Sequence, residues 1–342
     1  MKTLTLLLAS ILAITINNVV AQDYFLSQPQ ESPILVNPAN TGIIYPARAN
    51  LNYRQQWKSI LSNPFTTVIA SFDSKFLSQS STGSSLGLGI YIANDQSGTA
   101  KLNTMNINIA ISGKVLINDN QNLSAGITGG VMQRKVNTDN LTFYDQYDGY
   151  AYNSSLAQET FSLEQRLAPD IGAGIQWSYG KGTSTLSSND NIGAQLGIAA
   201  YHVNMPNTGF SEDIDKRYIR FLAHGSFSYG FKNTNIQLNP IVITQMQGPA
   251  KMFYGGMYVK YRLQESSKYT NNLLSRSLNV GGFYRLGDSY VTVFQLEWDK
   301  FAFGISYDLN ISRLNKVSKG NGSMEFSLRY IPLKPNIANR LL

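Results

Sequence analysis

The stretch Leu102–Gly113, which reads LNTMNINIAISG, alternates apolar side chains with small or polar ones. Side chains of a β-strand point alternately to opposite faces of the sheet. One face of this segment therefore prefers an apolar medium, and the other is small and polar. In a soluble sandwich the apolar face would pack into a core, whereas in an outer-membrane barrel it would face lipid and the polar face would line the lumen.

The composition favours the barrel over the sandwich. Charged residues make up 14% of the 342 residues, against roughly a quarter in ordinary globular domains. Tyr, Phe and Gly are abundant, with 20, 16 and 28 copies, and Tyr and Trp recur near the ends of the alternating segments, as in the aromatic girdles of barrels. No apolar run of about 18 residues follows position 21, which argues against membrane-spanning helices.

The alternating pattern recurs along the chain and predicts about fourteen strands. An even number of strands is expected of a closed antiparallel barrel with both ends in the periplasm. We therefore predict an all-β fold, a closed antiparallel transmembrane β-barrel of about 14 strands with a short N-terminal periplasmic arm. If the first strand runs outward, the long segment Asn137–Pro169 is extracellular. The predicted strands are 48–57, 65–74, 86–94, 102–114, 123–136, 170–180, 192–203, 217–231, 234–246, 253–263, 278–286, 289–298, 301–310 and 323–331.

The N-terminus has the features of a secretory signal, with Lys2, an apolar stretch at Leu4–Ile16 and small residues ending at Ala21. We predict a signal peptide at 1–21, an arm or plug-like segment at 22–46 with four prolines, the barrel at 47–331 and a tail at 332–342. The predicted location is the cell outer membrane, after removal of the signal peptide.

Charge and residue usage argue against several other functions. The net charge of +7 comes from scattered residues, whereas a nucleic-acid surface needs a localised basic face. Cysteine is absent, which removes disulfides and thiol chemistry. The two histidines, His202 and His224, fall on opposite faces of their predicted strands, so we expect no shared metal. A Gly-x-Ser-x-Gly spelling at 83–87 lacks the strand-then-helix context of a nucleophile elbow. We expect no enzymatic activity, no cofactor and no metal.

Four short motifs occur in order along the chain, the first of them within the arm: NPANTG from Asn37, YRQQW from Tyr53, PFTT from Pro64 and SFD from Ser71. Together they resemble the opening of the PorP/SprF family of type IX secretion system outer-membrane proteins of Bacteroidota. Segments 303–308 and 322–328 resemble the family's closing strands, and the middle third matches in pattern only. The residues that carry the motif are Asn37, Pro38, Ala39, Gly42, Tyr53, Arg54, Gln56, Trp57, Pro64, Thr66, Ser71 and Asp73.

The resemblance implies a non-enzymatic outer-membrane component of type IX secretion, associated with surface-protein secretion and gliding motility. The function expected is protein–protein contact in the secretion or surface retention of exported proteins. Its partners would be outer-membrane lipid, other secretion components on the periplasmic side and an exported cell-surface protein, with no nucleic acid. The alternative is a channel or transporter for small, apolar substrates in which the arm acts as a plug.

Two features are candidates for function within this frame. If Arg54 faces the lumen, it could pair with Asp73 on the neighbouring strand, either as a structural pair or as part of a contact with a partner or plug. The segment Asn137–Pro169 suits a protein or glycan partner, a lid folded into the lumen, or a calcium-stiffened loop. Its candidate residues for partner contact are Phe143, Tyr144, Asp145, Tyr147, Asp148, Tyr150 and Tyr152.

Overall fold

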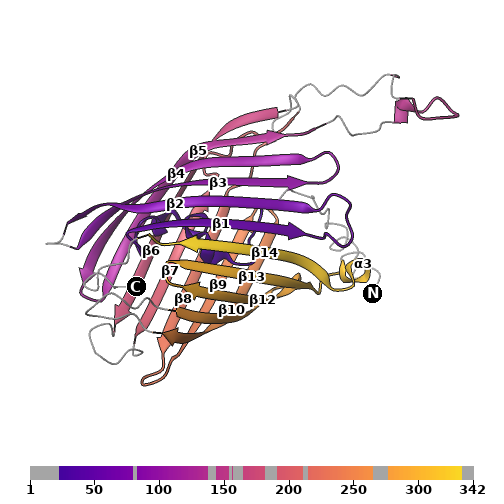
Figure 1. The fold of residues 1–342 in the computed structure, drawn as a ribbon. Coiled ribbons are helices and arrows are strands. Elements are labelled where there is room, and N and C mark those ends of the chain that lie inside the picture. The colour runs from indigo at the N-terminus through magenta and orange to yellow at the C-terminus, as the bar shows by residue number, and fades with distance from the viewer. Residues whose placement is uncertain are drawn as a thin grey trace, which may run out of the picture.

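The protein is a closed antiparallel β-barrel of 14 strands, as seen in a computed structural model (Figure 1). The structure describes residues 23–79, 83–137, 144–153, 156, 165–181, 191–210, 215–264 and 276–332. Each strand pairs with its neighbours in the chain, and β1 closes the barrel against β14. The predicted closed antiparallel barrel is confirmed, including the number of strands. In the described part of the chain no helix is long and apolar enough to cross a membrane.

The strands form where apolar and polar residues alternate. Their bounds are β1 (Ala47–Gln56), β2 (Phe65–Gln79), β3 (Ser84–Ser97), β4 (Leu102–Asn118), β5 (Gln121–Lys135), β6 (Gln165–Lys181), β7 (Ile192–Tyr201), β8 (Arg220–Gly230), β9 (Ile236–Gln247), β10 (Ala250–Gln264), β11 (Arg276–Arg285), β12 (Ser289–Trp298), β13 (Phe301–Asn310) and β14 (Asn321–Tyr330). The short helices are η1 (Pro29–Glu31), α2 (Pro33–Val36), η2 (Pro38–Asn40), η3 (Tyr144–Gln146) and α3 (Asn315–Ser318).

The two ends of the barrel differ. We call the end where β1 begins and β14 finishes the terminal rim, and the opposite end the loop rim. The loop rim carries the connections that follow odd-numbered strands, among them those holding η3 and α3, both on the right of Figure 1. Turns at the terminal rim include the two-residue link between β12 and β13, where Asp299 adopts a positive φ of 59°.

The alternation in β4 has the orientation expected of a barrel wall. Asn106, Asn108 and Ser112 are buried in the lumen, while Ile109 and Ile111 are exposed on the outer surface. The same arrangement of apolar residues outside and small or polar residues inside holds in β3, β5, β12 and β13. The outer surface is therefore suited to lipid.

Some strands are longer than the sequence pattern indicates. β6 begins at Gln165, opposite Lys135, although we predicted its start at 170, just after Pro169. β7 pairs with β6 only from Gly172 onward. Pro169 therefore lies where β6 has no neighbouring strand on one side, and proline is tolerated in such an edge position.

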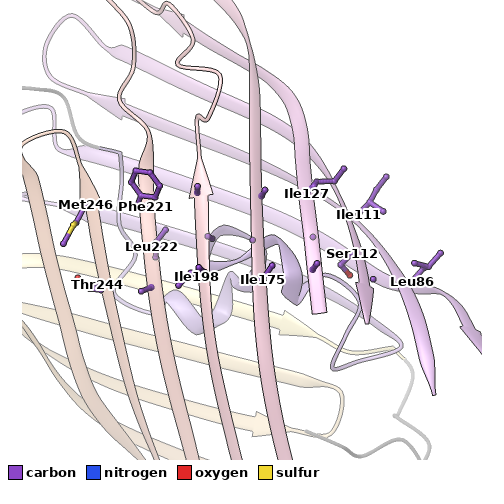
Figure 2. Close-up of a pocket in the computed structure, with 18 residues that line it drawn as sticks. Leu86, Ile111, Ser112, Ile127, Ile175, Ile198, Phe221, Leu222, Thr244 and Met246 are labelled. Atoms are coloured by element: carbon purple, nitrogen blue, oxygen red, sulfur yellow. The ribbon is translucent and has the colours of Figure 1, made fainter. Parts of the chain in front are cut away.

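A shallow groove of about 750 Å³ crosses the outer wall over β3 to β9 (Figure 2). Its floor holds small side chains, and larger ones such as Leu86, Ile127 and Phe221 border it. Gly126 and Gly174 also belong to this stretch of wall, and each is in contact with the N-terminal arm. The wall is therefore thin where the arm packs against its inner face.

Candidate functional site

The candidate site is the lumen, which the N-terminal arm crosses from one rim to the other. The arm, residues 23–46, begins beside the loop rim, where Asp23 contacts His202, and ends at the terminal rim, where Ala47 starts β1. Seventeen of its 24 residues are buried, and the other seven are partly buried. Three consecutive short helices, η1, α2 and η2, each begin with a proline at the first or second helical position, where the missing N–H costs nothing.

At the loop rim, Asp23 lies in a cluster of buried charges. Its carboxylate accepts a hydrogen bond from Arg217, whose guanidinium approaches Asp23 Oδ1, and Arg220 Nε lies 3.3 Å from Asp23 Oδ2. His202 bridges two carboxylates, with Nε2 2.7 Å from Asp23 Oδ2 and Nδ1 2.7 Å from Asp170 Oδ1. This cluster fixes the start of the arm to β6, β8 and the β7–β8 connection.

The charges in this cluster shift the pKa of two groups that lie outside the strands. Burial would raise the pKa of Asp23, but Arg217, His202 and Arg220 outweigh it and hold that pKa well below its ordinary value. Burial would lower the pKa of His202, but Asp23 and the hydrogen bond to Asp170 outweigh it and raise that pKa above its ordinary value. Both side chains are therefore favoured in their charged forms.

The predicted orientation of His202 is wrong. If the strand alternation continued, His202 would face lipid, because the preceding residue, Tyr201, points inward. However, β7 ends at Tyr201, and His202 adopts a left-handed backbone conformation with φ of 57°. That backbone change ends the alternation and turns the imidazole into the barrel. His202 and His224 both face the lumen, yet they have different partners, Asp170 and Asp23 for the first and Asn37 for the second.

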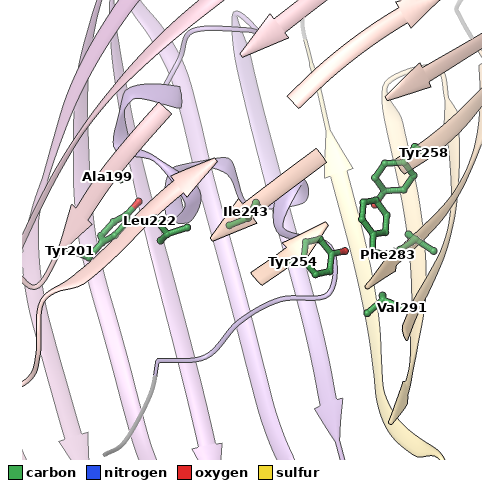
Figure 3. Close-up of a cluster of buried hydrophobic side chains, with 9 residues drawn as sticks. Ala199, Tyr201, Leu222, Ile243, Tyr254, Tyr258, Phe283 and Val291 are labelled. Atoms are coloured by element: carbon green, nitrogen blue, oxygen red, sulfur yellow. The ribbon is translucent and has the colours of Figure 1, made fainter. Parts of the chain in front are cut away.

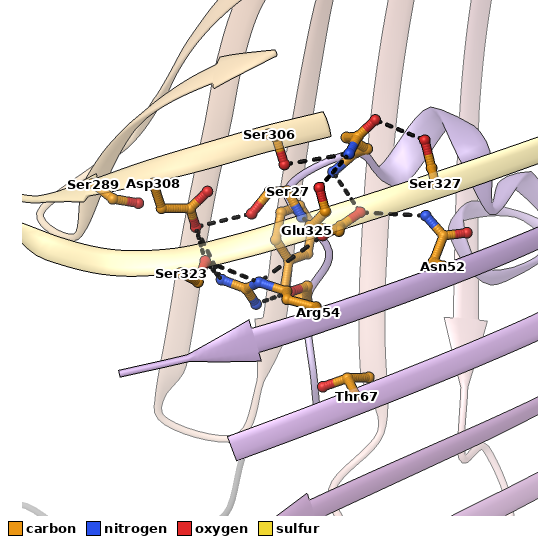
Figure 4. Close-up of polar contacts among 12 residues, drawn as sticks. Ser27, Asn52, Arg54, Thr67, Ser289, Ser306, Asp308, Ser323, Glu325 and Ser327 are labelled. Carbon is orange, nitrogen blue, oxygen red and sulfur yellow. Dashed lines mark hydrogen bonds and ion pairs between the residues drawn. The ribbon is translucent and has the colours of Figure 1, made fainter. Parts of the chain in front are cut away.

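Further along the arm, two backbone amides are held by one carboxylate of the wall (Figure 4). Ser27 N donates to Glu325 Oε2 at 2.6 Å, and Gln28 N donates to Glu325 Oε1 at 3.1 Å. The Ser27 hydroxyl donates to Asp308 Oδ2 at 2.8 Å, and Arg54 Nη2 donates to the same oxygen at 3.0 Å. Side chains from β1, β13 and β14 thus converge on one short segment.

The predicted pairing of Arg54 with Asp73 is wrong. In the β1–β2 register Arg54 lies opposite Thr67, and Arg48 lies opposite Asp73. Arg48 donates to both oxygens of Asp73, at 2.9 and 3.0 Å. Arg54 instead pairs with Asp308 and donates to the carbonyl oxygen of Phe25 in the arm. Arg54 therefore contacts a plug, the arm, and also forms a structural ion pair, with Asp308 as the acid.

The NPANTG motif forms the part of the arm that contacts the inner wall most closely. Asn37 Oδ1 accepts a hydrogen bond from Ala39 N at 2.9 Å, which caps η2. Asn37 Nδ2 donates to the carbonyl oxygen of Ile175 at 2.9 Å and lies 3.1 Å from His224 Nε2. One side chain therefore both starts the local helix and attaches it to β6 and β8.

Glycines in the facing strands make room for this motif. A Cβ atom added to Gly126 would lie 2.5 Å from the carbonyl group of Pro38, and one added to Gly87 would collide with the carbonyl oxygen of Thr41. A Cβ at Gly174 would collide with the Asn37 amide. These contacts agree with the interpretation of the inward glycines as residues that let a plug approach the wall.

Two further residues attach the arm to the wall, Gly42 in its last turn and Glu31 at the end of η1. Gly42 adopts φ of 61°, and its N–H donates to Asp73 Oδ2 at 2.9 Å. Glu31 Oε1 accepts from Gln295 Nε2 at 2.7 Å and from Arg329 Nη1 at 3.1 Å. The arm is thus bonded to the wall from Asp23 to Gly42.

An apolar cluster in the lumen complements these polar contacts (Figure 3). Tyr254 and Phe283 stack with ring centroids 5.0 Å apart, and Tyr258 meets Phe283 edge-on at 4.8 Å. Phe25 of the arm packs against Tyr254 at 5.4 Å. The hydroxyl of Tyr254 also donates to the carbonyl oxygen of Ser27 at 2.7 Å. Aromatic residues of β10 and β11 therefore hold the same arm segment as the charges in Figure 4.

The remaining motif residues do not enter this lumen network as a group. Tyr53 is exposed on the outer wall, and Gln56 lies at the end of β1. The Trp57 ring meets Phe65 edge-on at 5.0 Å at the loop rim. Thr66 Oγ1 donates to the carbonyl oxygen of Pro64 at 3.4 Å. Ser71 Oγ accepts from Asn50 Nδ2 at 3.3 Å inside the barrel.

Most of the candidate contact loop that the structure describes is exposed at the loop rim. Tyr144 and Tyr150 are 94% and 95% exposed, and Tyr147 and Tyr152 are exposed and bridge to each other through their backbones. Asp148 accepts hydrogen bonds from the backbone of Ala151 and Tyr150, which lower its pKa. Phe143 and the side chain of Asp145 lie outside the described residues.

Sequence reasoning missed several residues that hold the arm. The alternation of β13 and β14 placed Asp308 and Glu325 on the inner face, but it gave no partner for either. Ser27, Glu31 and Arg48 carried no motif signal at all. Among the described residues, no group of three or more His, Cys, Asp or Glu side chains could hold a metal ion.

A family model described as type IX secretion system membrane protein PorP/SprF matches residues 18–330. No curated protein sequence matches. Similar solved structures include the CymD monoaromatic hydrocarbon channel, 10% identical with a TM-score of 0.44, covering 93% of this chain and 96% of that one. BamA from Haemophilus ducreyi is 9% identical with a TM-score of 0.41, covering 84% and 70%. A Pseudomonas aeruginosa FadL homologue is 11% identical with a TM-score of 0.42, covering 86% and 92%.

Proposed function

The chain belongs to the PorP/SprF family of type IX secretion system membrane proteins, and from this premise we propose that it acts by protein–protein contact in the outer membrane. In this proposal it takes part in the secretion or the surface retention of exported proteins, and in gliding motility where that depends on such proteins. It is inserted after removal of residues 1–21, and it carries out no catalysis.

The observation that carries the proposal is the bonded arm in the lumen. A barrel that conducts small substrates needs an open path or a plug that moves aside. Here the arm is attached by ion pairs and hydrogen bonds at both rims and in between, through Asp23, Ser27, Glu31 and Gly42. Removing one partner from a buried charge pair costs about 3–5 kcal/mol. An arm with several such attachments does not move aside easily. It therefore supports a role in protein–protein contact over a role as a channel that the arm opens and closes.

The two rims supply different surfaces for contact. The two longest connections, 136–164 and 202–219, belong to the loop rim, and the structure describes exposed aromatic residues there, such as Tyr144 and Tyr150. In the proposal the loop rim faces an exported surface protein, and the terminal rim faces periplasmic components of the machine. The orientation follows from the expectation that short turns lie on the periplasmic side.

Gene deletion with complementation tests the proposal. We expect the deletion strain to lose a surface protein from the cell while uptake of small apolar substrates is unchanged, and the wild-type gene to restore it. Purified barrel in planar bilayers should show no substrate-dependent flux. Flux through the wild-type barrel together with normal surface display in the deletion strain would overturn the proposal and support the transporter alternative.

A further inference from the structure

A concave apolar surface lies at the loop rim between three neighbouring connections. The connections are 57–64 after β1, 98–101 after β3 and 311–320 after β13. They enclose a groove of about 650 Å³, which we call the rim groove. Trp57, Ile60, Leu61, Ser62, Asn63, Phe65, Gly98, Thr99, Leu314 and Val317 line it. A volume of this size is in the range of pockets that bind ligands or side chains of a partner.

Three apolar side chains of the rim groove are exposed although they lie outside the strands. Val317 of α3 is 67% exposed, and Leu61 and Leu314 are also exposed. The strand residues of the outer wall have lipid as a neighbour, but these residues belong to connections beyond the strand ends. A contiguous exposed apolar patch bordered by polar residues indicates an interaction site.

The three connections that enclose the rim groove are strongly basic. Its three connections contain Lys58, Lys101, Arg313, Lys316 and Lys319, and no Asp or Glu. The chain as a whole has 28 basic and 21 acidic residues, an excess of seven. None of the five cations takes part in an ion pair among the described residues, whereas buried arginines such as Arg48 and Arg54 do. The groove therefore suits an acidic segment with apolar or aromatic side chains.

The same rim carries a segment of that chemistry. Residues 144–153 read YDQYDGYAYN, with four tyrosines, two aspartates and no basic residue. We call this segment the tyrosine tip. Hydrogen bonds from the backbone of Tyr150 and Ala151 to Asp148 shape it, and its Tyr144 and Tyr150 rings are almost fully exposed. Figure 1 shows η3, at the start of the tip, well beyond the ends of β5 and β6.

We propose that the rim groove of one copy of this chain binds the tyrosine tip of a neighbouring copy in the same membrane. Both surfaces lie at the loop rim, so two parallel barrels can present them to each other. They occupy different parts of the rim, β13 to β4 for the groove and β5–β6 for the tip. The contact is therefore heterologous, which produces rings or open rows rather than an isolated pair.

The chemistry of the contact follows from the side chains. Tyrosine rings bury apolar area against Leu61, Leu314 and Val317, and tyrosine is among the residues that dominate binding energy at interfaces. Lys and Arg on the border attract both the aspartates and the faces of the rings. This assembly concerns copies of the barrel itself, and it is distinct from the proposed role in secretion, because its test needs neither an exported protein nor other components.

Two variants of the full chain isolate the two surfaces. The groove variant is Lys58→Glu/Lys101→Glu/Lys316→Glu. The tip variant is Tyr144→Ser/Asp145→Asn/Asp148→Asn/Tyr150→Ser, in which the amide introduced at position 148 keeps an oxygen to accept the two backbone hydrogen bonds. The control is Lys181→Glu/Lys232→Glu/Lys300→Glu, which changes the same charge at exposed positions of the terminal rim. Heat-modified migration on gels verifies that each variant forms a barrel.

Each chain is co-expressed with two different affinity tags, extracted in mild detergent and purified on one tag, and the other tag is then measured. We expect the wild type and the control each to co-purify with a second copy of itself. For each surface variant expressed alone, the amount of the second tag recovered should fall at least tenfold. A mixture of groove variant and tip variant should recover co-purification, because the tip of the first copy meets the intact groove of the second. Crosslinking should show wild type in assemblies larger than two and the mixture as pairs.

Several results would overturn this contact. Wild type that does not co-purify with itself means that no such assembly forms. Groove or tip variants that co-purify as wild type mean that another surface is responsible. If co-purification is lost in both variants and is not restored in their mixture, the two surfaces do not bind each other. That result is expected if the groove binds an acidic segment of a different protein.

Discussion

Arg48 and Asp73 face each other across β1 and β2, and their bidentate pair also holds the end of the arm. Arg48 Nε lies 2.9 Å from Asp73 Oδ1, and Asp73 Oδ2 accepts the N–H of Gly42 at 2.9 Å. Both side chains are buried. The carboxylate therefore joins the first strand, the second strand and the last turn of the arm at one point.

Removing this carboxylate should destabilise the barrel strongly. Asp73→Ala leaves the Arg48 guanidinium buried without its acid, which costs about 3–5 kcal/mol. The free energy of unfolding by urea in detergent micelles measures the effect. The control is Asp215→Ala, which removes the exposed acid that pairs with Arg134 at 3.6 Å and should cost less than about 1 kcal/mol. Equal losses in the two variants would contradict the role assigned to Asp73.

The wall glycines give a test of how closely the arm packs. Gly126→Val should destabilise by about 1–3 kcal/mol, because its Cβ would meet the Pro38 carbonyl, and it should make the arm accessible to protease. Gly129→Val is the matched control, since Gly129 lies on the outward face of the same strand and a Cβ there has no neighbour within 4 Å. Proteolysis of the arm at the same rate in both variants would show that the arm does not pack against β5.

Lipid contact on the outer wall is tested by introducing charge at a strand centre. Ile127 is 60% exposed in the middle of β5, and Leu286 is 64% exposed in the turn after β11. Ile127→Arg should destabilise by about 2–4 kcal/mol in bilayers, and Leu286→Arg by no more than about 1 kcal/mol. Folding titrations in lipid vesicles measure both. A similar cost at the two positions would argue against hydrocarbon around β5.

The cluster around His202 should make stability depend on pH. Asp23 and Asp170 hold the pKa of His202 above its ordinary value despite burial. Because this pKa is higher in the folded chain, the stabilisation is complete below the unfolded pKa of about 6.5 and disappears as pH rises through the folded pKa. The free energy of unfolding of wild type relative to His202→Gln should therefore be largest near pH 5.5, about one unit below that value, and decrease as the pH is raised. A difference that grows with pH would contradict this assignment.

The strand pattern and the inward or outward direction of most residues could be predicted because both depend on local sequence. Within Leu102–Gly113 the period of two separates Ile109 from Asn108, and lipid outside and the lumen inside then fix which face each occupies. The pattern fails where the backbone changes, as at His202 with its positive φ, or where a strand has a free edge, as at Pro169.

The sequence by itself determined a 14-strand wall with an apolar exterior, and its motifs identified the family. Only the tertiary structure decided where the arm lies and which charges hold it. The reason is that strand register pairs residues that no local rule connects. Arg48 rather than Arg54 meets Asp73, and Ser27 meets Glu325 across 298 positions of the chain. The second of these contacts depends on the closure of β1 against β14, which brings the two ends of the barrel sequence around a single arm.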